Sequence, residues 1–166
     1  LPRDYVSGET LFYLGRRYVL KRVPSGTERH VKLLRGQIQV TGSDLTRSRV
    51  RSDLKAWYRH RAKEVFQRRF VHVEGRLRWL THRPSWRLLE MKTQWGSCSP
   101  KGDVLLNPHL VKAPTECIDY VILHELCHLE EHNHSQRFYD LLTYAMPRWE
   151  TAKQRLDGMA ELLLNE

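Results

Sequence analysis

The five residues His124-Glu125-Leu126-Cys127-His128 decide how this chain is interpreted, because their spacing suits a helix that holds one metal ion. Residues four apart on an α-helix are separated by about one turn and by about 40° around the axis, so both imidazoles can face the same ion. Glu125 then lies beside that ion and beside any water bound to it. A carboxylate in this position is typical of zinc hydrolases, in which it takes a proton from the water.

Apolar residues on both sides of the motif predict that its helix is largely buried. Ile118 and residues 120–123 precede the motif, and Leu126 and Leu129 continue the apolar face. Two histidines and a glutamate inside a protein are unfavourable unless another group pairs with them. The simplest alternative is a pair of core histidines satisfied by hydrogen bonds. The accompanying carboxylate favours a metal site instead.

A catalytic zinc site needs a third protein ligand, and the segment after the motif offers several. His132 continues the four-residue rhythm, but on an unbroken helix it lies about 12 Å from His124, which is too far. The helix is therefore expected to stop at Asn133, a residue that tolerates the left-handed conformation, and Ser135 is suited to cap the next helix. His134 lies on this turn and is the predicted third ligand. The alternatives are Glu131 and His132.

Two related motifs overlap the same residues. The run His128-Leu129-Glu130-Glu131-His132 is the inverted form of the motif, in which Glu131 would be the base one turn later on the helix. That turn is already polar and near the expected helix end. A metalloprotease pattern with five residues between the second and third histidine fits the spacing, but it requires glycine where this chain has Glu131.

The motif and its flanking residues resemble one protein family, the YgjP-like metallopeptidases, which are similar in outline to SprT-like minimal zinc peptidases. The resemblance covers about residues 5–149 and is strongest from Trp95 onward. The matching residues are Trp95-Gly96-Ser97-Cys98-Ser99, Lys101-Gly102, Leu105-Leu106-Asn107, Ile118-Asp119-Tyr120-Val121, the His-Glu-x-x-His motif, Asn133-His134-Ser135 and Phe138.

This resemblance implies zinc bound by His124, His128 and His134, with Glu125 as the catalytic acid and base. It also implies hydrolysis of peptide bonds in a protein or peptide substrate. The chain departs from the family pattern in having Cys127 where alanine is frequent, and Gln94 where a basic residue is common. Neither position is a predicted ligand.

Composition is consistent with a compact α+β enzyme of 166 residues, of which 40% are hydrophobic. The chain has no run of about 18 apolar residues, so no membrane association is expected. Three scattered cysteines argue against a disulfide framework and favour a reducing, cytoplasmic setting. Because the first residue is Leu1 rather than methionine, we expect that it is not the native start.

The order of the expected elements divides the chain into residues 1–70 and residues 71–166, which we expect to pack as one compact unit. The first part reads as an antiparallel meander followed by a long helix, and the second part as the metallopeptidase core. Pro114, Ser135 and Pro147 are expected to open helices. The expected strands are residues 11–14, 17–22, 30–34, 37–41, 88–93 and 104–107, and the expected long helix is residues 45–70.

The loop of residues 95–102 has three interpretations. It could lie over the metal and position substrate, with the strand of residues 104–107 pairing with an extended peptide by edge addition. Alternatively, Trp95 and Cys98 could simply be core residues. In the third interpretation Cys98 is a ligand, as in a zinc amide hydrolase that is not a peptidase. The residue that stabilises the oxyanion is not identified, and the weak candidates are Tyr139, Tyr144 and His109.

Positive charge is the second strong signal, with 28 Lys and Arg against 19 Asp and Glu, a net charge of +9. The excess concentrates in residues 47–69 and predicts either nonspecific, salt-sensitive contact with nucleic acid or a solvated helix face. An alternative function is therefore a basic nucleic-acid-associated protein with a structural zinc, although such a site has no use for Glu125. The basic residues of this stretch are Arg47, Arg49, Arg51, Lys55, Arg59, Arg61, Lys63, Arg68 and Arg69.

Overall fold

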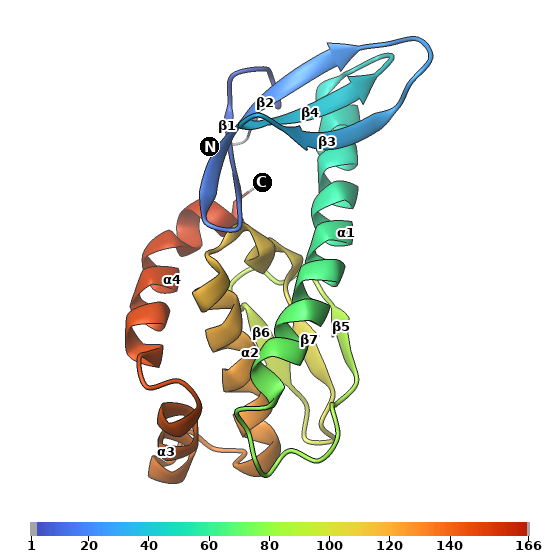
Figure 1. Cartoon of the computed structure of the whole chain (residues 1–166). Helices are drawn as coiled ribbons and strands as arrows, with labels where there is room; N and C mark the ends of the chain where they lie inside the picture. The colour runs from blue at the N-terminus through green and yellow to red at the C-terminus, as the bar shows by residue number, and fades with distance from the viewer. Residues whose placement is uncertain (1–2, 166) are drawn as a thin grey trace.

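The computed structural model describes residues 3–165, so Leu1 and the expectation attached to it lie outside the described residues. It confirms the α+β class: a four-stranded sheet, a long helix, a second sheet of three strands and three further α-helices follow one another (Figure 1). The N-terminal sheet consists of β1 (Thr10–Tyr13), β2 (Arg16–Pro24), β3 (His30–Leu34) and β4 (Gln37–Gly42).

The N-terminal sheet differs from the expected antiparallel meander in one pairing. Its strand order is β1-β2-β4-β3, and β2 pairs with β4 in parallel, whereas β1–β2 and β3–β4 are antiparallel. The turn at Arg35 and Gly36, both with positive φ, closes a tight β3–β4 hairpin. Ile38 and Val40 of β4 are fully buried, and β3 is only half-buried. The more buried strand therefore takes the central position beside β2.

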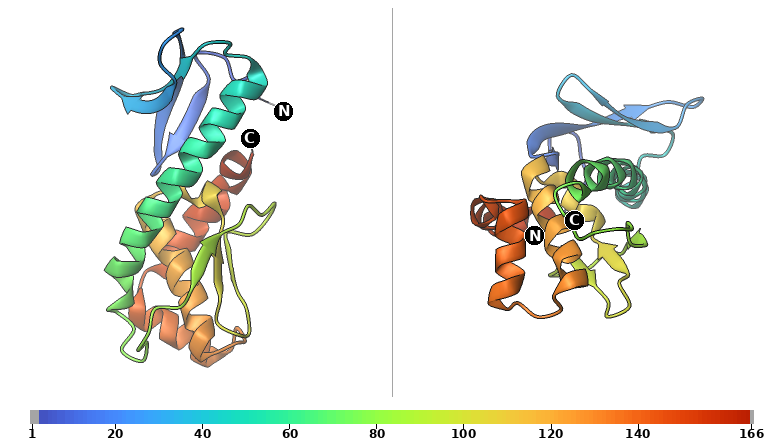
Figure 2. Two further views of the ribbon diagram at one scale, coloured as in Figure 1. Left: turned by 90° about the vertical axis from the view of Figure 1, so that its right-hand side faces the viewer. Right: turned by 60° about the horizontal axis from the view of Figure 1, so that its bottom comes forward.

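Helix α1 (Arg47–Glu74) connects the two halves of the molecule. Thr46 caps it by accepting a hydrogen bond from the backbone N–H of Arg49. Its 28 residues correspond to about 42 Å. Figure 2 shows α1 running from the N-terminal sheet along the remaining helices to the opposite end of the molecule. The helix thus packs against both halves, and no break occurs at the expected boundary after residue 70.

The second half contains a small sheet with the order β5-β7-β6, in which β5–β7 is parallel and β6–β7 antiparallel. The expected strand at residues 88–93 is wrong except for its first residue, because the chain after Leu89 is irregular and mostly exposed. The expected loop at residues 95–102 contains a strand. The elements are β5 (Trp86–Leu88), β6 (Gly96–Cys98), β7 (Val104–Leu106), the 3-10 helix η1 (Pro108–Lys112), α2 (Thr115–Glu130), α3 (Gln136–Ala145) and α4 (Trp149–Leu164).

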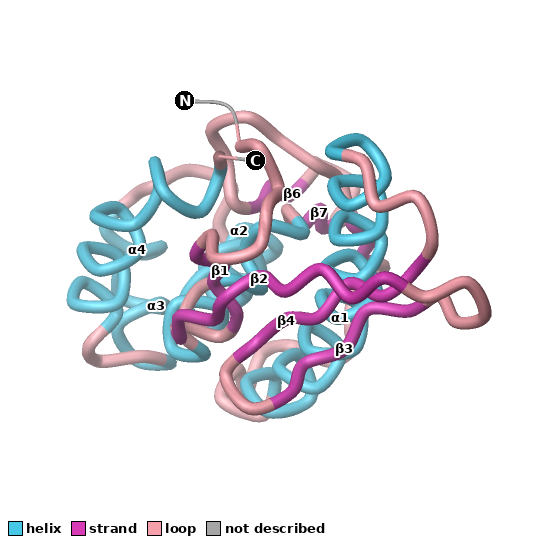
Figure 3. The backbone as a smooth tube through the Cα atoms, turned by 90° about the horizontal axis from the view of Figure 1, so that it is seen from above, coloured by secondary structure: helices cyan, strands magenta, loops and turns pink. Residues whose placement is uncertain are grey.

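Helix α2 is the central helix of the core. It lies between α4 on one side and α1 on the other, as the view from above also shows (Figure 3). It follows Pro114 as expected, but it ends at Glu130, before Asn133, which was the expected stopping point. Ser135 caps α3 through the backbone N–H of Phe138, as expected. Within residues 3–165 no helix is long and apolar enough to cross a membrane.

The turn between β1 and β2 attaches the N-terminal sheet to the start of α2. The backbone N–H groups of Leu14 and Gly15 donate to the carbonyls of Val111 and Lys112, each at 2.9 Å. Gly15 has a φ of +81°, and a Cβ atom there would lie 2.8 Å from Cγ of Pro114. Only glycine fits this contact, in which the backbone of the β1–β2 turn packs against Pro114, the residue before α2.

A buried ion pair holds α1 against α2. Arg69 donates two hydrogen bonds to the carboxylate of Asp119, from Nε at 2.8 Å and from Nη2 at 2.7 Å. Asp119 is 5% exposed, so its charge depends on this bidentate partner.

We expect Arg69→Ala to lower the free energy of unfolding by about 2–4 kcal/mol, because it leaves the Asp119 carboxylate buried without its charge partner. The Arg69 side chain is 24% exposed, which places the loss below that of a fully buried pair. The neighbouring Arg68 is exposed, and Arg68→Ala is the matched control with a change within about 0.5 kcal/mol. Urea denaturation measures both. Equal stability of the two variants would contradict the role given to this pair.

Candidate metal centre

Three histidines converge at the end of α2. His124 and His128 lie on the helix, and His134 lies on the turn that leads into α3. Nε2 of His134 is 3.2 Å from Nε2 of His124 and 3.0 Å from Nε2 of His128. Among the described residues these three form the one group of His, Cys, Asp or Glu side chains with metal-binding spacing. The structure therefore brings together the three histidines that the sequence predicted.

Neighbouring groups orient the three imidazoles. Nδ1 of His128 is 3.2 Å from the carbonyl of Glu131. Because a carbonyl only accepts, Nδ1 carries the proton and leaves the lone pair of Nε2 directed at the other rings. The fully buried ring of Phe138 packs against all three histidines, with centroid distances of 5.0, 4.6 and 5.0 Å to His124, His128 and His134. These contacts fix the positions of the rings.

The electrostatics of the cluster favour neutral imidazoles. Burial, and to a smaller extent the neighbouring His128 and His134, lowers the pKa of His124 to about 4. Burial also lowers the pKa of His128. Imidazole nitrogens whose lone pairs converge repel one another unless a cation lies between them. Three nitrogens about 2.05 Å from a tetrahedral zinc ion lie about 3.3 Å apart, so the observed spacing fits such an ion.

Glu125 lies beside this cluster and is only 7% exposed. Burial raises its pKa to about 7. The backbone of β6 passes close to it: a Cβ atom at Gly96 would lie 3.1 Å from Cγ of Glu125 and 3.2 Å from Cγ1 of Val121. Gly96 therefore lets the strand approach α2 where the carboxylate sits, a role that its position in the sequence motif did not disclose.

A cleft of about 550 Å³ opens over the three histidines and Glu125. That volume falls in the range of about 300–1,000 Å³ typical of ligand sites. Residues of β6 and the segment before it form one wall, and α2 forms the other. The wall residues most relevant to chemistry are Gly96, Ser97, Cys98, Tyr120, Glu125 and His132.

The alternative ligands are placed differently. The side chain of Glu131 faces Arg137, with the closest oxygen 3.7 Å from Nε, and it is the Glu131 backbone that contacts the site. His132 lines the cleft and Cys98 lines its other wall, but neither belongs to the three-histidine group. The inverted motif, with Glu131 as base, is therefore not supported by the geometry.

The three residues considered for stabilising the oxyanion do not line the cleft. His109 binds Lys112 and Glu90 elsewhere, and Tyr144 is exposed on α3. Tyr139 packs against His134 with ring centroids 6.1 Å apart but does not line the cleft. Tyr120 does line it, one turn before His124, and its hydroxyl is 3.5 Å from Nδ1 of that residue. Tyr120 precedes His124 by four residues, and this helical spacing could have identified it as a neighbour of the site.

Comparison with known proteins identifies one matching family. The family model described as YgjP-like, metallopeptidase domain, matches residues 1–159. Among solved structures, the zymogen of the metallopeptidase abylysin from Pyrococcus abyssi is 24% identical, with 63% of this chain and 97% of that chain covered and a TM-score of 0.49. The jannalysin zymogen from Methanocaldococcus jannaschii is 23% identical, with 61% and 96% covered and a TM-score of 0.45. A search of curated protein sequences found no match.

Removing one histidine should remove most of the metal affinity. Wild type is expected to purify with close to one zinc per chain, and His134→Ala should weaken zinc binding by more than the about 10- to 100-fold typical of losing an outer partner. His132→Ala, which changes a cleft histidine outside the group, is the control and should retain the metal. Chelator competition followed by elemental analysis measures both. If His132→Ala loses zinc and His134→Ala keeps it, the third ligand is assigned to the wrong residue.

Proposed function

The chain belongs to the YgjP-like metallopeptidase family, and from that premise we propose that it hydrolyses peptide bonds with a zinc ion held by His124, His128 and His134. The observation that supports this proposal best is the position of Glu125. Its buried carboxylate lies next to three converging imidazole nitrogens at the floor of an open cleft. A purely structural metal site would not need an acid in that position.

The proposed mechanism depends on proton transfer by Glu125. A zinc ion bound at the site would supply Lewis acidity, which acidifies a water and polarises the scissile carbonyl. The Glu125 carboxylate takes the proton from the attacking water and returns it to the leaving amide nitrogen. A pKa near 7 without the ion suits a group that both accepts and donates a proton, and a neighbouring divalent cation would lower it and favour the ionised base.

The proposed substrate is an extended peptide that lies along β6. The sequence suggested the strand of residues 104–107 for edge addition, but β7 (Val104–Leu106) is the central strand and is paired on both sides. Within the described residues β6 is an edge strand, and Gly96, Ser97 and Cys98 all line the cleft. A peptide added to this edge would gain backbone hydrogen bonds and pass the metal centre.

A zinc amide hydrolase that uses Cys98 as a ligand is less well supported. Burial, and to a smaller extent the nearby carboxylate of Glu125, raises the pKa of the Cys98 thiol to about 11. Cys98 lines the cleft, but it lies outside the group of three histidines whose nitrogen spacing suits a metal ion. A reducing, cytoplasmic setting stays a proposal that rests on the odd number and scattered positions of Cys98, Cys117 and Cys127 in the sequence.

Nucleic-acid contact through α1 stays a prediction. Several cations of the stretch have partners inside the protein: Lys55 pairs with Glu90, Arg69 pairs with Asp119, and Arg61 packs over the rings of Tyr13 and Trp57. Exposed cations remain along the helix, namely Arg49, Arg59, Lys63 and Arg68. These four residues would carry any contact with phosphates.

Glu125→Gln tests the peptidase mechanism. We expect the fold and the zinc content to be unchanged and the chelator-sensitive cleavage of a peptide substrate to fall at least about 100- to 10,000-fold, because the variant lacks the general base. Glu116→Gln makes the same chemical change at an exposed position of α2 and should retain activity. The substrate is first found by incubating wild type with a peptide library. Equal rates for wild type and Glu125→Gln would exclude this mechanism.

Salt dependence tests the nucleic-acid prediction. If the exposed cations of α1 contact phosphates, the logarithm of DNA affinity should fall with the logarithm of salt concentration by about 0.9 per duplex phosphate contacted. Arg49→Glu, Lys63→Glu and Arg68→Glu together should flatten that slope. Fluorescence anisotropy with a labelled duplex measures it. Absence of binding at low salt would leave α1 as a solvated helix face.

A further inference from the structure

A second hollow lies between α1 and β5, at the edge of the small sheet opposite β6. Its volume is about 550 Å³, which falls in the range of about 300–1,000 Å³ typical of ligand sites. One face of α1 and all three residues of β5 line it. Because successive side chains of a strand point to opposite faces, consecutive residues share one groove where it runs along the edge of the strand. We call this hollow the β5 groove.

The backbone of β5 is open on the side away from β7. The carbonyl of Ser85 and the N–H of Leu89, on either side of β5, bond to β7 at 3.0 Å each. Backbone groups of a strand alternate between its two edges, so those of Trp86 and Leu88 point away from β7. Within residues 3–165 no other strand and no hydrogen bond occupies them. Such an edge can accept an extended peptide as a further strand.

Positive charge lines both walls of the β5 groove. Arg59 and Lys63 come from α1 and Arg87 from β5, and all three residues are exposed. Among the described residues none of the three has an ion-pair partner, and no carboxylate lines the groove. His60 also lines it, but its Nε2 already lies 3.4 Å from a carboxylate oxygen of Glu64. Cations gathered along a partly enclosed channel attract a negatively charged partner.

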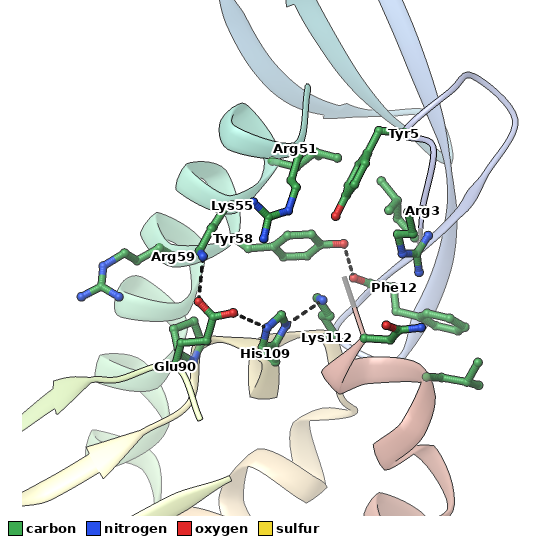
Figure 4. Close-up of a pocket in the computed structure, with 15 residues that line it drawn as sticks. Arg3, Tyr5, Phe12, Arg51, Lys55, Tyr58, Arg59, Glu90, His109 and Lys112 are labelled. Carbon is green, nitrogen blue, oxygen red and sulfur yellow. Dashed lines mark hydrogen bonds and ion pairs between the residues drawn. The ribbon is translucent and has the colours of Figure 1, made fainter. Parts of the chain in front are cut away.

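Glu90, the acid that follows β5 in the chain, does not neutralise these cations. Its Oε2 is 2.9 Å from Nζ of Lys55, and its Oε1 is 3.1 Å from Nε2 of His109. Figure 4 shows both contacts at the wall of another cavity, and it shows the Arg59 guanidinium pointing away from them. The charge of Arg59 is therefore directed outward, where a partner can reach it.

The surroundings of Trp86 favour a peptide over nucleic acid in the β5 groove. Its ring stacks on Phe70 with centroids 5.3 Å apart and contacts the ring of Phe66 at 6.3 Å, and its Nε1 donates to Gln67 at 3.3 Å. The ring is thus engaged by α1, whereas proteins that bind single strands offer open aromatic faces to the bases. A free backbone edge is of use only to a polypeptide, which can extend the hydrogen-bond ladder.

We propose that the β5 groove binds an extended, acidic segment of a partner protein as an added strand. The segment pairs with the free backbone groups of Trp86 and Leu88, and its carboxylates lie near Arg59, Lys63 and Arg87. A second copy of this chain does not fit the groove, because pairing of the two β5 edges would set like charges against each other. The groove and the metal cleft lie at opposite edges of one sheet, so the segment is held rather than cleaved.

Fluorescence anisotropy on the zinc-loaded protein tests this proposal. The probe is a labelled, terminally blocked eight-residue peptide of alternating valine and glutamate, and its counterpart of alternating valine and lysine should bind at least about tenfold more weakly. N-methylation of every second residue removes the N–H groups along one edge of the peptide. Methylation of the set that faces β5 should weaken binding about tenfold or more, and methylation of the other set less than about twofold.

Two matched variants locate the binding. Arg59→Glu should weaken the affinity for the acidic peptide about fivefold or more, because an attraction in the groove becomes a repulsion. Arg68→Glu makes the same charge change at another exposed position of α1, on the opposite face and outside the groove, and should alter affinity less than about twofold. Arg87→Glu tests the wall formed by β5 and should act like Arg59→Glu. Circular dichroism and zinc content check that each variant is folded.

Four outcomes would overturn the proposal. Absence of binding at about 1 mM peptide in low salt excludes the site. Equal effects of the two methylation patterns exclude strand addition, and affinity unchanged by Arg59→Glu and Arg87→Glu places the peptide elsewhere, the metal cleft included. A single-stranded oligonucleotide that binds more tightly than the acidic peptide, and is weakened by the same variants, assigns the groove to nucleic acid. Because these measurements record binding and not cleavage, failure here leaves the proposed peptidase function untouched.

Discussion

The convergence of three imidazole nitrogens at the end of α2 is the constraint on which the rest of the structure depends. A helix that carries two histidines and a glutamate into the interior must replace the water those groups lose. The fold meets this requirement by ending α2 at Glu130 and by turning the chain so that His134 comes back to His124 and His128. The ring of Phe138 then packs against all three imidazole rings.

The placement of α2 accounts for the remaining elements. Helix α1 and the Arg69–Asp119 ion pair cover one side, α4 covers another, and β6 closes the face that carries Glu125. The close approach of β6 depends on Gly96, since a Cβ atom there would crowd Cγ of Glu125 and Cγ1 of Val121. The cleft is thus a product of packing on the helix rather than of a separate domain boundary.

The metal-motif helix and the grouping of its three histidines were predictable because their signal is local. Four-residue spacing identifies His124 and His128, and the distance limit on an unbroken helix points to His134. The end of the helix was misjudged, because Glu131 already has extended backbone and Asn133 is not needed to stop it.

Elements that depend on distant partners were not predictable. Gly96–Cys98 has little strand propensity and forms β6 only by pairing with β7 and packing on α2. The parallel pairing of β2 with β4 likewise depends on which strand is buried. In residues 88–93 the apolar run ends one residue after β5, and the chain there becomes exposed, so no strand continues. The role of Phe138 as a neighbour of the histidines appears only once the three rings have been assembled.

The contact between Gly15 and Pro114 bears on how the protein is made on the ribosome. The glycine leaves the exit tunnel about a hundred residues before the proline against which it packs, so the sheet and α1 are synthesised while much of their buried surface lacks a partner. Docking of the turn becomes possible only after η1 has emerged, and the histidines follow later still. The nascent chain therefore passes through a stage with an exposed apolar helix face, when chaperone binding or a fast rate of elongation would have the greatest effect on the yield of folded protein.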